Sequence, residues 1–147
     1  MIIREFDIDD IDEITELMKK LCTLKGQEFD EIRWRDSIEN RMKKDSDLEV
    51  IVAFDKLTEQ VIGMAHCSIR VSDEGSRFGV VSNLIVKEEK RRTGIGELLM
   101  RHAVDYFRRN HIHSIRLALK TSLDKGAKIL FKKLGFEEVF RIFELTL

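Results

Sequence analysis

Apolar residues along this chain follow two different periods, and the changes from one period to the other predict its elements. Spacings of three and four residues are typical of amphipathic helices, whereas short alternating or continuous apolar runs are typical of strands. The predicted helices cover residues 11–21, 32–42, 95–107 and 127–134, and the predicted strands cover residues 2–6, 49–54, 61–71, 80–86, 114–119 and 139–147.

The order of these elements predicts the fold class. One strand and two helices precede three strands, and a helix, a strand, a helix and a last strand follow them. The polar turn at 55–60 predicts a hairpin, and the helix that begins near Gly96 predicts one crossover. We therefore expect a mixed α/β (α+β) fold in which helices cover both faces of a largely antiparallel central sheet. At 147 residues the chain is expected to form a single domain, 1–147.

Charge and composition narrow the possible functions. The net charge of −1 gives no overall attraction to nucleic acid or to membranes. No apolar run reaches the roughly 18 residues of a membrane span, and the acidic N-terminus is unlike a signal peptide, so we expect a cytoplasmic protein. Cys22 and Cys67 fit neither a metal-binding nor a redox spacing. We expect both to be buried small side chains, and we expect no metal.

The segment from Lys87 to Gly96 carries the clearest chemical signal. It predicts a basic, glycine-containing loop between a strand and the N-terminus of a helix. The first turn of a helix has unpaired N–H groups and a partial positive charge, which together attract phosphate. Gly94 and Gly96 let an anion approach the backbone, and Arg91 and Arg92 add charge. The loop is predicted to hold a pyrophosphate; the alternative is a surface loop whose glycines only shape a turn.

Two other phosphate-binding patterns fit this loop less well. A P-loop is excluded because no Gly-Lys-Ser/Thr follows the glycines. A dinucleotide fingerprint fits poorly because Leu99 occupies the position of its third glycine. A long charged loop also separates these glycines from the end of the strand.

The pattern Arg91-x-x-Gly94-x-Gly96 resembles the acyl-coenzyme A signature of the GNAT superfamily of N-acetyltransferases. A second pattern, Ala127-x-x-Leu130-Phe131-x-x-x-Gly135-Phe136, resembles that family's later motif, which flanks the far side of the cofactor. The resemblance implies a GNAT-like fold, strands 80–86 and 114–119 that splay around the pantetheine arm, and transfer of an acetyl group from acetyl-coenzyme A (acetyl-CoA) to a primary amine. Direct transfer is expected because neither cysteine lies in a motif that suggests a covalent relay. The implied cofactor contacts are Ile85, Val86, Arg91, Arg92, Thr93, Gly94, Ile95, Gly96, Glu97, Asp124, Ala127 and Phe131.

For catalysis, the resemblance places the thioester carbonyl at the backbone of residues 84–86, so the main chain at Leu84 is expected to stabilise the oxyanion. Three positions depart from the family's pattern. Phe131 stands where a tyrosine commonly protonates the departing sulfur, and Asp124 stands where asparagine is frequent. Ser82-Asn83 occupies the region that often supplies a glutamate base. General acid catalysis is worth about 10²–10⁴-fold, so transfer without the tyrosine is expected to be slow.

His66 is the candidate for the missing base or for a proton relay, because the unperturbed pKa of histidine, about 6.5, suits proton removal at neutral pH. A packing role within its strand is the alternative. His102 is expected on the apolar face of its helix. Candidates to contact a cationic amine are Glu28, Trp34 and Asp73.

The alternative function is a coenzyme A binding module with little or no catalysis, which would act as a sensor or an interaction subunit. Phe131 and the missing glutamate favour this module. A nucleotide-binding regulator is a third hypothesis. The sequence also leaves a homodimer open and does not identify the amine.

Overall fold

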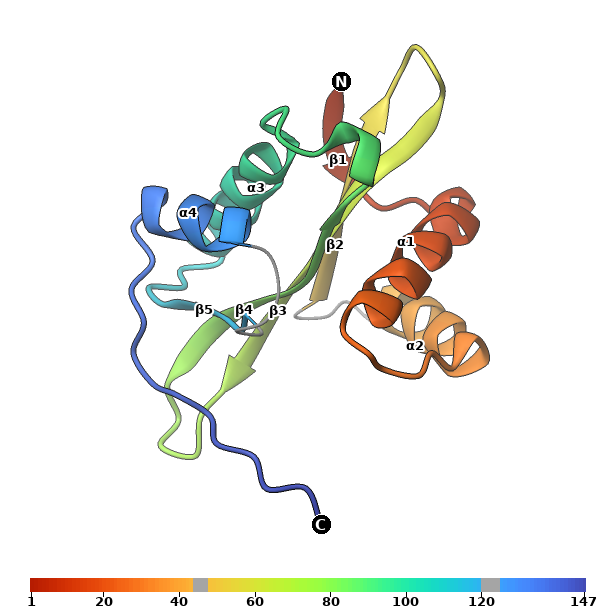
Figure 1. The fold of residues 1–147 in the computed structure, drawn as a ribbon. Coiled ribbons are helices and arrows are strands. Elements are labelled where there is room, and N and C mark those ends of the chain that lie inside the picture. Colours follow the sequence, from red (N-terminus) through yellow and green to blue (C-terminus); the bar gives the residue numbers. More distant parts are fainter. Residues whose placement is uncertain (44–47, 120–124) are drawn as a thin grey trace.

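The computed structural model describes residues 1–43, 48–119 and 125–147 (Figure 1). The strands are β1 (Ile2–Glu5), β2 (Leu48–Asp55), β3 (Gln60–Val71), β4 (Arg77–Val86) and β5 (Ile115–Leu117). The helices are α1 (Ile11–Leu24), α2 (Glu31–Lys43), α3 (Ile95–Arg109) and α4 (Lys125–Lys133), with the 3-10 turns η1 (Ile8–Asp10) and η2 (Glu88–Lys90).

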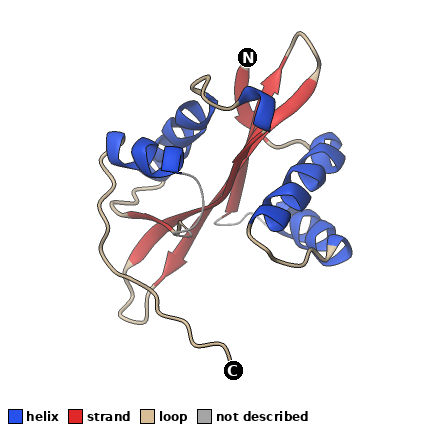
Figure 2. Ribbon diagram, viewed as in Figure 1, coloured by secondary structure: helices blue, strands red, loops and turns tan. Residues whose placement is uncertain are grey.

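The five strands form one sheet in the order β1-β2-β3-β4-β5. Pairing is antiparallel from β1 to β4, and β5 joins β4 in parallel after the crossover through α3. Figure 2 shows α1 and α2 on one face of the sheet and α3 and α4 on the other. The expected mixed fold, with a largely antiparallel sheet between helices, is confirmed.

Each face of the sheet has its own apolar core. The core under α3 combines Leu99, Met100 and Phe107 with the β3 side chains Ala65 and Cys67. The core under α1 and α2 combines side chains of these two helices with other positions of the strands. Its buried residues are Phe6, Ile14, Leu17, Leu21, Ile38, Val50, Val52, Val61, Met64 and Ile85. Alternation along the strands therefore supplies both cores. Cys22 and Cys67 are buried free thiols, as expected.

Two expectations, one about the burial of His102 and one about a last strand, are wrong. His102 is exposed, because the buried stripe of α3 runs through Leu99, Ala103 and Phe107 and leaves His102 at its edge. Residues 139–147 form no strand; they are exposed, and they run as a coil whose end lies apart from the sheet and the helices (Figure 1). A segment with an alternating pattern forms a strand only when the edge of a sheet accepts its backbone hydrogen bonds. The edge strand β5 is only three residues long, so it offers few such partners. Within the described ranges, no helix is long and apolar enough to cross a membrane.

Candidate active site

The glycine loop has the geometry of an anion site. Arg92 and Gly94 both have left-handed backbone conformations, with φ of 64° and 85°. Gly94 is the N-cap of α3, and the hydrogen bond from the Leu98 N–H to the Gly94 carbonyl, at 3.1 Å, is at the start of the helix. The N–H groups of Ile95, Gly96 and Glu97 precede it and so have no acceptor inside the helix. The loop therefore presents several donors and the positive end of the helix dipole together.

Side chains hold this loop in place and leave space next to its two glycines. The Thr93 hydroxyl donates to the Lys90 carbonyl at 2.5 Å, and the Arg91 Nε–H donates to the Val86 carbonyl at 3.1 Å. A Cβ on Gly94 would meet nothing within 4 Å, and one on Gly96 would meet only the Leu130 side chain, at 3.5 Å. The residues present thus fit a bound diphosphate.

Helix α4 flanks the same loop. Glu97 forms ion pairs with Arg101 at 2.8 Å and with Lys133 of α4 at 3.1 Å. Hydrogen bonds from these two cations lower the pKa of Glu97. Phe131 packs on the α3-side core with its ring 6.0 Å from that of Phe136. The two sequence motifs, about thirty residues apart, therefore meet in space; Asp124 lies outside the described residues.

Strands β4 and β5 run together only briefly. Their described ladder covers three pairs, from Gly79 with Ile115 to Val81 with Leu117. Beyond Val81, β4 continues to Val86 with no described β5 partner. Among the described residues, no strand pairs with this edge of Leu84 to Val86, which lies beside the glycine loop that follows. This agrees with the splayed strands that the family resemblance implies.

A bulge in β4 marks this open stretch. His66 pairs with Ser82 and Met64 pairs with Ile85, so β4 has two residues, Asn83 and Leu84, where β3 has one. Asn83 takes a left-handed conformation with φ of 55°. Because of the extra residue, Val81 and Leu84 both pack on the α3 side although they are three positions apart.

Asn83, His66 and Trp34 are brought together at this bulge, although they come from β4, β3 and α2. The Nδ2 atom of Asn83 lies 3.0 Å from the Nδ1 atom of His66. The Trp34 ring stacks on the His66 ring with centroids 5.1 Å apart and planes 3° apart. His66 is only 4% exposed, and its Nε2 atom is buried. The imidazole is thus fixed by two neighbours.

The other polar candidates do not join this cluster. Glu28 and Asp73 are exposed, and no described contact links them to His66. Burial raises the pKa of the Cys67 thiol to about 12, so this cysteine is no nucleophile. Among the described residues there is no group of three or more histidine, cysteine or acidic side chains that could hold a metal.

Asn83 joins this cluster although its position in the sequence predicts no role for it. Its signal was present, because an isolated asparagine interrupts an apolar strand in which Val81 and Leu84 are spaced by three rather than two. Asparagine tolerates positive φ better than most residues, which is consistent with a bulge.

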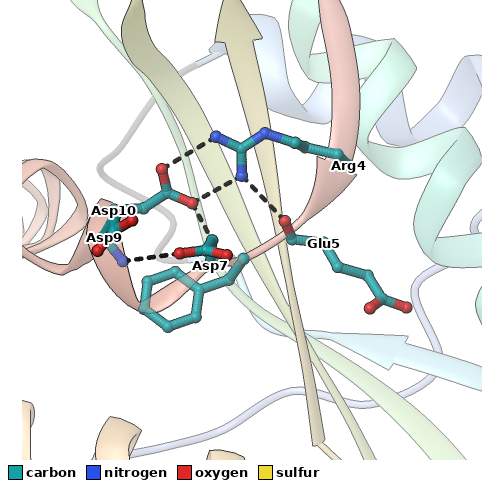
Figure 3. A pocket seen from close by; sticks show the side chains of 6 residues that line it. Arg4, Glu5, Asp7, Asp9 and Asp10 are labelled. Atoms are coloured by element: carbon teal, nitrogen blue, oxygen red, sulfur yellow. Dashed lines mark hydrogen bonds and ion pairs between the residues drawn. The ribbon is translucent and has the colours of Figure 1, made fainter.

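A second polar pocket lies at the start of α1 and contains none of the loop residues (Figure 3). Arg4 donates to both carboxylate oxygens of Asp10, at 2.7 and 3.0 Å. Asp7 and Asp10 form a reciprocal capping box, in which each side chain accepts from the other end of the turn. These groups satisfy one another, so this pocket serves the structure of the turn.

Comparisons with known proteins agree with this geometry. The solved structure of a protein from Clostridium acetobutylicum, described as a predicted acetyltransferase with acetyl-CoA, is 20% identical with a TM-score of 0.80 over 99% of this chain and 95% of that chain. Glucosamine-6-phosphate N-acetyltransferase from Arabidopsis thaliana is 13% identical, with a TM-score of 0.80 over 99% and 97%.

The aminoglycoside 6'-N-acetyltransferase of Acinetobacter haemolyticus is 20% identical, with a TM-score of 0.79 over 100% and 98% of the two chains. At these identities the likeness establishes the fold alone. A comparison with curated proteins gives no significant match. Residues 11–136 match the acetyltransferase (GNAT) family, so the chain belongs to that family.

Proposed function

We propose that this protein transfers an acetyl group from acetyl-CoA directly to a primary amine. The observation that carries the proposal is the N-terminus of α3, with Arg92 and Gly94 in left-handed conformations, next to the open edge of β4. Membership of the acetyltransferase family supports the reaction class.

The glycine loop, the end of β4 and helix α4 would each contact a different part of the cofactor. The N–H groups from Arg92 to Glu97, including those of Thr93 and Ile95, would bind the diphosphate, with the exposed Arg91 adding charge. The backbone at Ile85 and Val86 would pair with the pantetheine arm. Ala127 and Phe131 of α4 would contact the far side of the cofactor. Asp124 is proposed to contact the cofactor as well.

The backbone near Leu84 would stabilise the oxyanion that forms when the amine attacks the thioester carbonyl. A C–N bond forms and the C–S bond breaks, and the proton lost by nitrogen ends on the sulfur of coenzyme A. His66 stays a predicted base or relay, and its role is indirect because Nε2 is buried and Nδ1 faces Asn83.

A coenzyme A binding module without efficient catalysis is the second candidate. Phe131 favours it, because its ring packs on the α3-side core and carries no hydroxyl to protonate the sulfur. A pH–rate profile separates the two functions. Transfer to an amine should rise with pH as the amine loses its proton, whereas a module should show no enzyme-dependent transfer.

The experiment that tests the proposal is a calorimetric titration with acetyl-CoA, with ATP and NAD in parallel. Micromolar one-site binding of acetyl-CoA alone is expected. Gly96→Glu should abolish this binding, because it places a carboxylate at the phosphate site. His102→Glu adds the same charge on the exposed side of the same helix and should bind normally. Unchanged affinity in folded Gly96→Glu would refute the loop assignment.

We also propose that the chain forms a single domain and that the protein is cytoplasmic. We further propose that two copies form a homodimer. The support is the apolar surface of the C-terminal segment, where Phe143 is 92% and Leu145 is 83% exposed. Burying such side chains is favourable, and a second copy offers the same segment and the same β5 edge. Light scattering after gel filtration should give a dimer, and Phe143→Asp with Leu145→Asp should give a monomer. A monomeric wild type would overturn the homodimer.

A further inference from the structure

The amide nitrogen of Asn83 is hydrogen-bonded to His66, and the amide oxygen can accept a hydrogen bond from a substrate. Its amide nitrogen lies 3.0 Å from His66 Nδ1, an arrangement in which the amide donates and the imidazole nitrogen accepts. The amide oxygen is on the other branch of the group, and no residue in the described ranges donates a hydrogen bond to it. Asn83 is half-buried, whereas His66 behind it is buried, so Asn83 is the member of the pair that a substrate can reach.

We propose that Asn83 binds the amine substrate, with its Oδ1 atom accepting a hydrogen bond from the amine N–H, and that His66 holds Asn83 in position. The inference rests on the proposed acetyl transfer and assigns the amine-binding group within it. It makes Asn83 a catalytic residue by contact, and it gives His66 a positioning role in place of the base or relay role predicted above.

The bulge places this oxygen where the reaction needs it. Asn83 directly precedes Leu84, whose backbone is proposed to hold the thioester carbonyl. An amine bound at Oδ1 would therefore lie beside the carbon that it attacks, which lowers the entropic cost of their encounter. Without the extra residue in β4, strict alternation from Val81 would turn the Asn83 side chain to the α3 side of the sheet, away from His66.

His66 is suited to a supporting role. Its ring is stacked on Trp34 and surrounded by protein, so its position is fixed from two directions. Donation to Nδ1 fixes which half of the Asn83 amide faces inward, and so keeps Oδ1 outward. The resulting site offers a neutral acceptor. Unlike a carboxylate, it has no negative charge to favour the ammonium form, so it raises the pKa of the bound amine less and opposes loss of the proton less.

The test compares kinetics of Asn83→Gly with wild type. Glycine accepts the positive φ at this position, so the variant loses the amide without straining the bulge. Glu59→Gly is the matched control, because Glu59 has φ of 54° in the exposed β2–β3 turn. The probe is the best substrate among glycinamide, benzylamine, spermidine and Nα-acetyl-lysine.

Loss of one hydrogen bond predicts a rise of about 3–10-fold in KM for the amine in Asn83→Gly, with KM for acetyl-CoA unchanged. Glu59→Gly should leave both constants unchanged. An unchanged amine KM in folded Asn83→Gly, with the wild type active, would overturn this inference and leave the proposed function standing. A wild type that acetylates none of these amines would overturn the proposed function, and this inference with it.

Two variants of His66 test the positioning role. His66→Phe keeps an aromatic ring against Trp34 but cannot accept from Asn83, so it should raise the amine KM about as much as Asn83→Gly. His66→Gln supplies a side-chain oxygen that can accept the same hydrogen bond, and should restore most of the affinity. If His66→Gln is as impaired as His66→Phe, His66 does not act through Asn83.

Discussion

Gly79 of β4 lies directly under the ring of Phe107 of α3. A Cβ on Gly79 would come within 2.5 to 2.9 Å of three carbon atoms of that ring, which is closer than real Cβ atoms approach. The contact sets how closely the crossover helix lies on the sheet. The two elements that it joins also carry the candidate site, because β4 contains the bulge and α3 begins at the glycine loop.

Gly79→Ala should therefore destabilise the fold. Overpacking of a well-packed core costs about 1–3 kcal/mol, because the ring or the backbone must shift. Thermal unfolding should show the loss, and Phe107→Leu should recover part of it in the double variant by vacating the space. Additive losses in the double variant would mean that the ring is not what Gly79 accommodates.

Asp10 should give the protein a pH-dependent contribution to stability. Burial raises the pKa of Asp10, but the hydrogen bonds from Arg4 and from the Asp7 N–H outweigh it, and the net shift is downward. A lowered pKa in the folded state means that the stabilisation is present above the unfolded pKa of about 3.9 and is lost as the pH falls through the folded value.

Asp10→Asn should thus lower the free energy of unfolding by about 1–3 kcal/mol at pH 7, and the difference from wild type should shrink near pH 3. Urea unfolding at both values measures it. Asp9→Asn, in the same turn but exposed, is the control and should change little. A deficit in Asp10→Asn that stays constant with pH would show that the ion pair is not its source.

The features that sequence predicted best are those set by local pattern. The buried stripe of α3 follows directly from a period near 3.6, and the glycines and arginines before it mark the helix start. The bulge at Asn83 depends on what β3 places opposite, which no local pattern records. Residues 139–147 have the composition of a strand, but the pattern does not say whether a free edge will receive them.

A pair of acidic side chains should make the protein less stable as the pH rises. Burial raises the pKa of Glu49 to about 7, and the hydrogen bond and charge of Glu5 add to the shift, while Arg109 opposes it. An acid whose pKa is raised in the folded state stabilises fully below its unfolded pKa, and this stability is lost as the pH rises through the folded value.

Glu49→Gln should therefore be more stable than wild type at pH 8 by about 1–2 kcal/mol, after allowance for solvent screening, and equal to it near pH 4. Glu5→Gln removes the repelling neighbour and should act in the same direction. Thermal unfolding from pH 4 to pH 8 checks both. Parallel curves for wild type and Glu49→Gln would contradict the raised pKa.

Phe131→Tyr should raise turnover with the best amine, if α4 lies along the cofactor as the family resemblance implies. The new hydroxyl would protonate the departing thiolate, and general acids contribute about 10²–10⁴-fold where geometry is optimal, so a gain of at least a few-fold is expected. Phe136→Tyr adds a hydroxyl to the neighbouring ring, 6.0 Å away, and should give no gain. Steady-state kcat at saturating acetyl-CoA is the measurement. Suppose instead that Phe131→Tyr folds and binds acetyl-CoA normally but turns over much more slowly. The phenyl ring itself would then be required against the core under α3, and the thiolate would leave without help from this position.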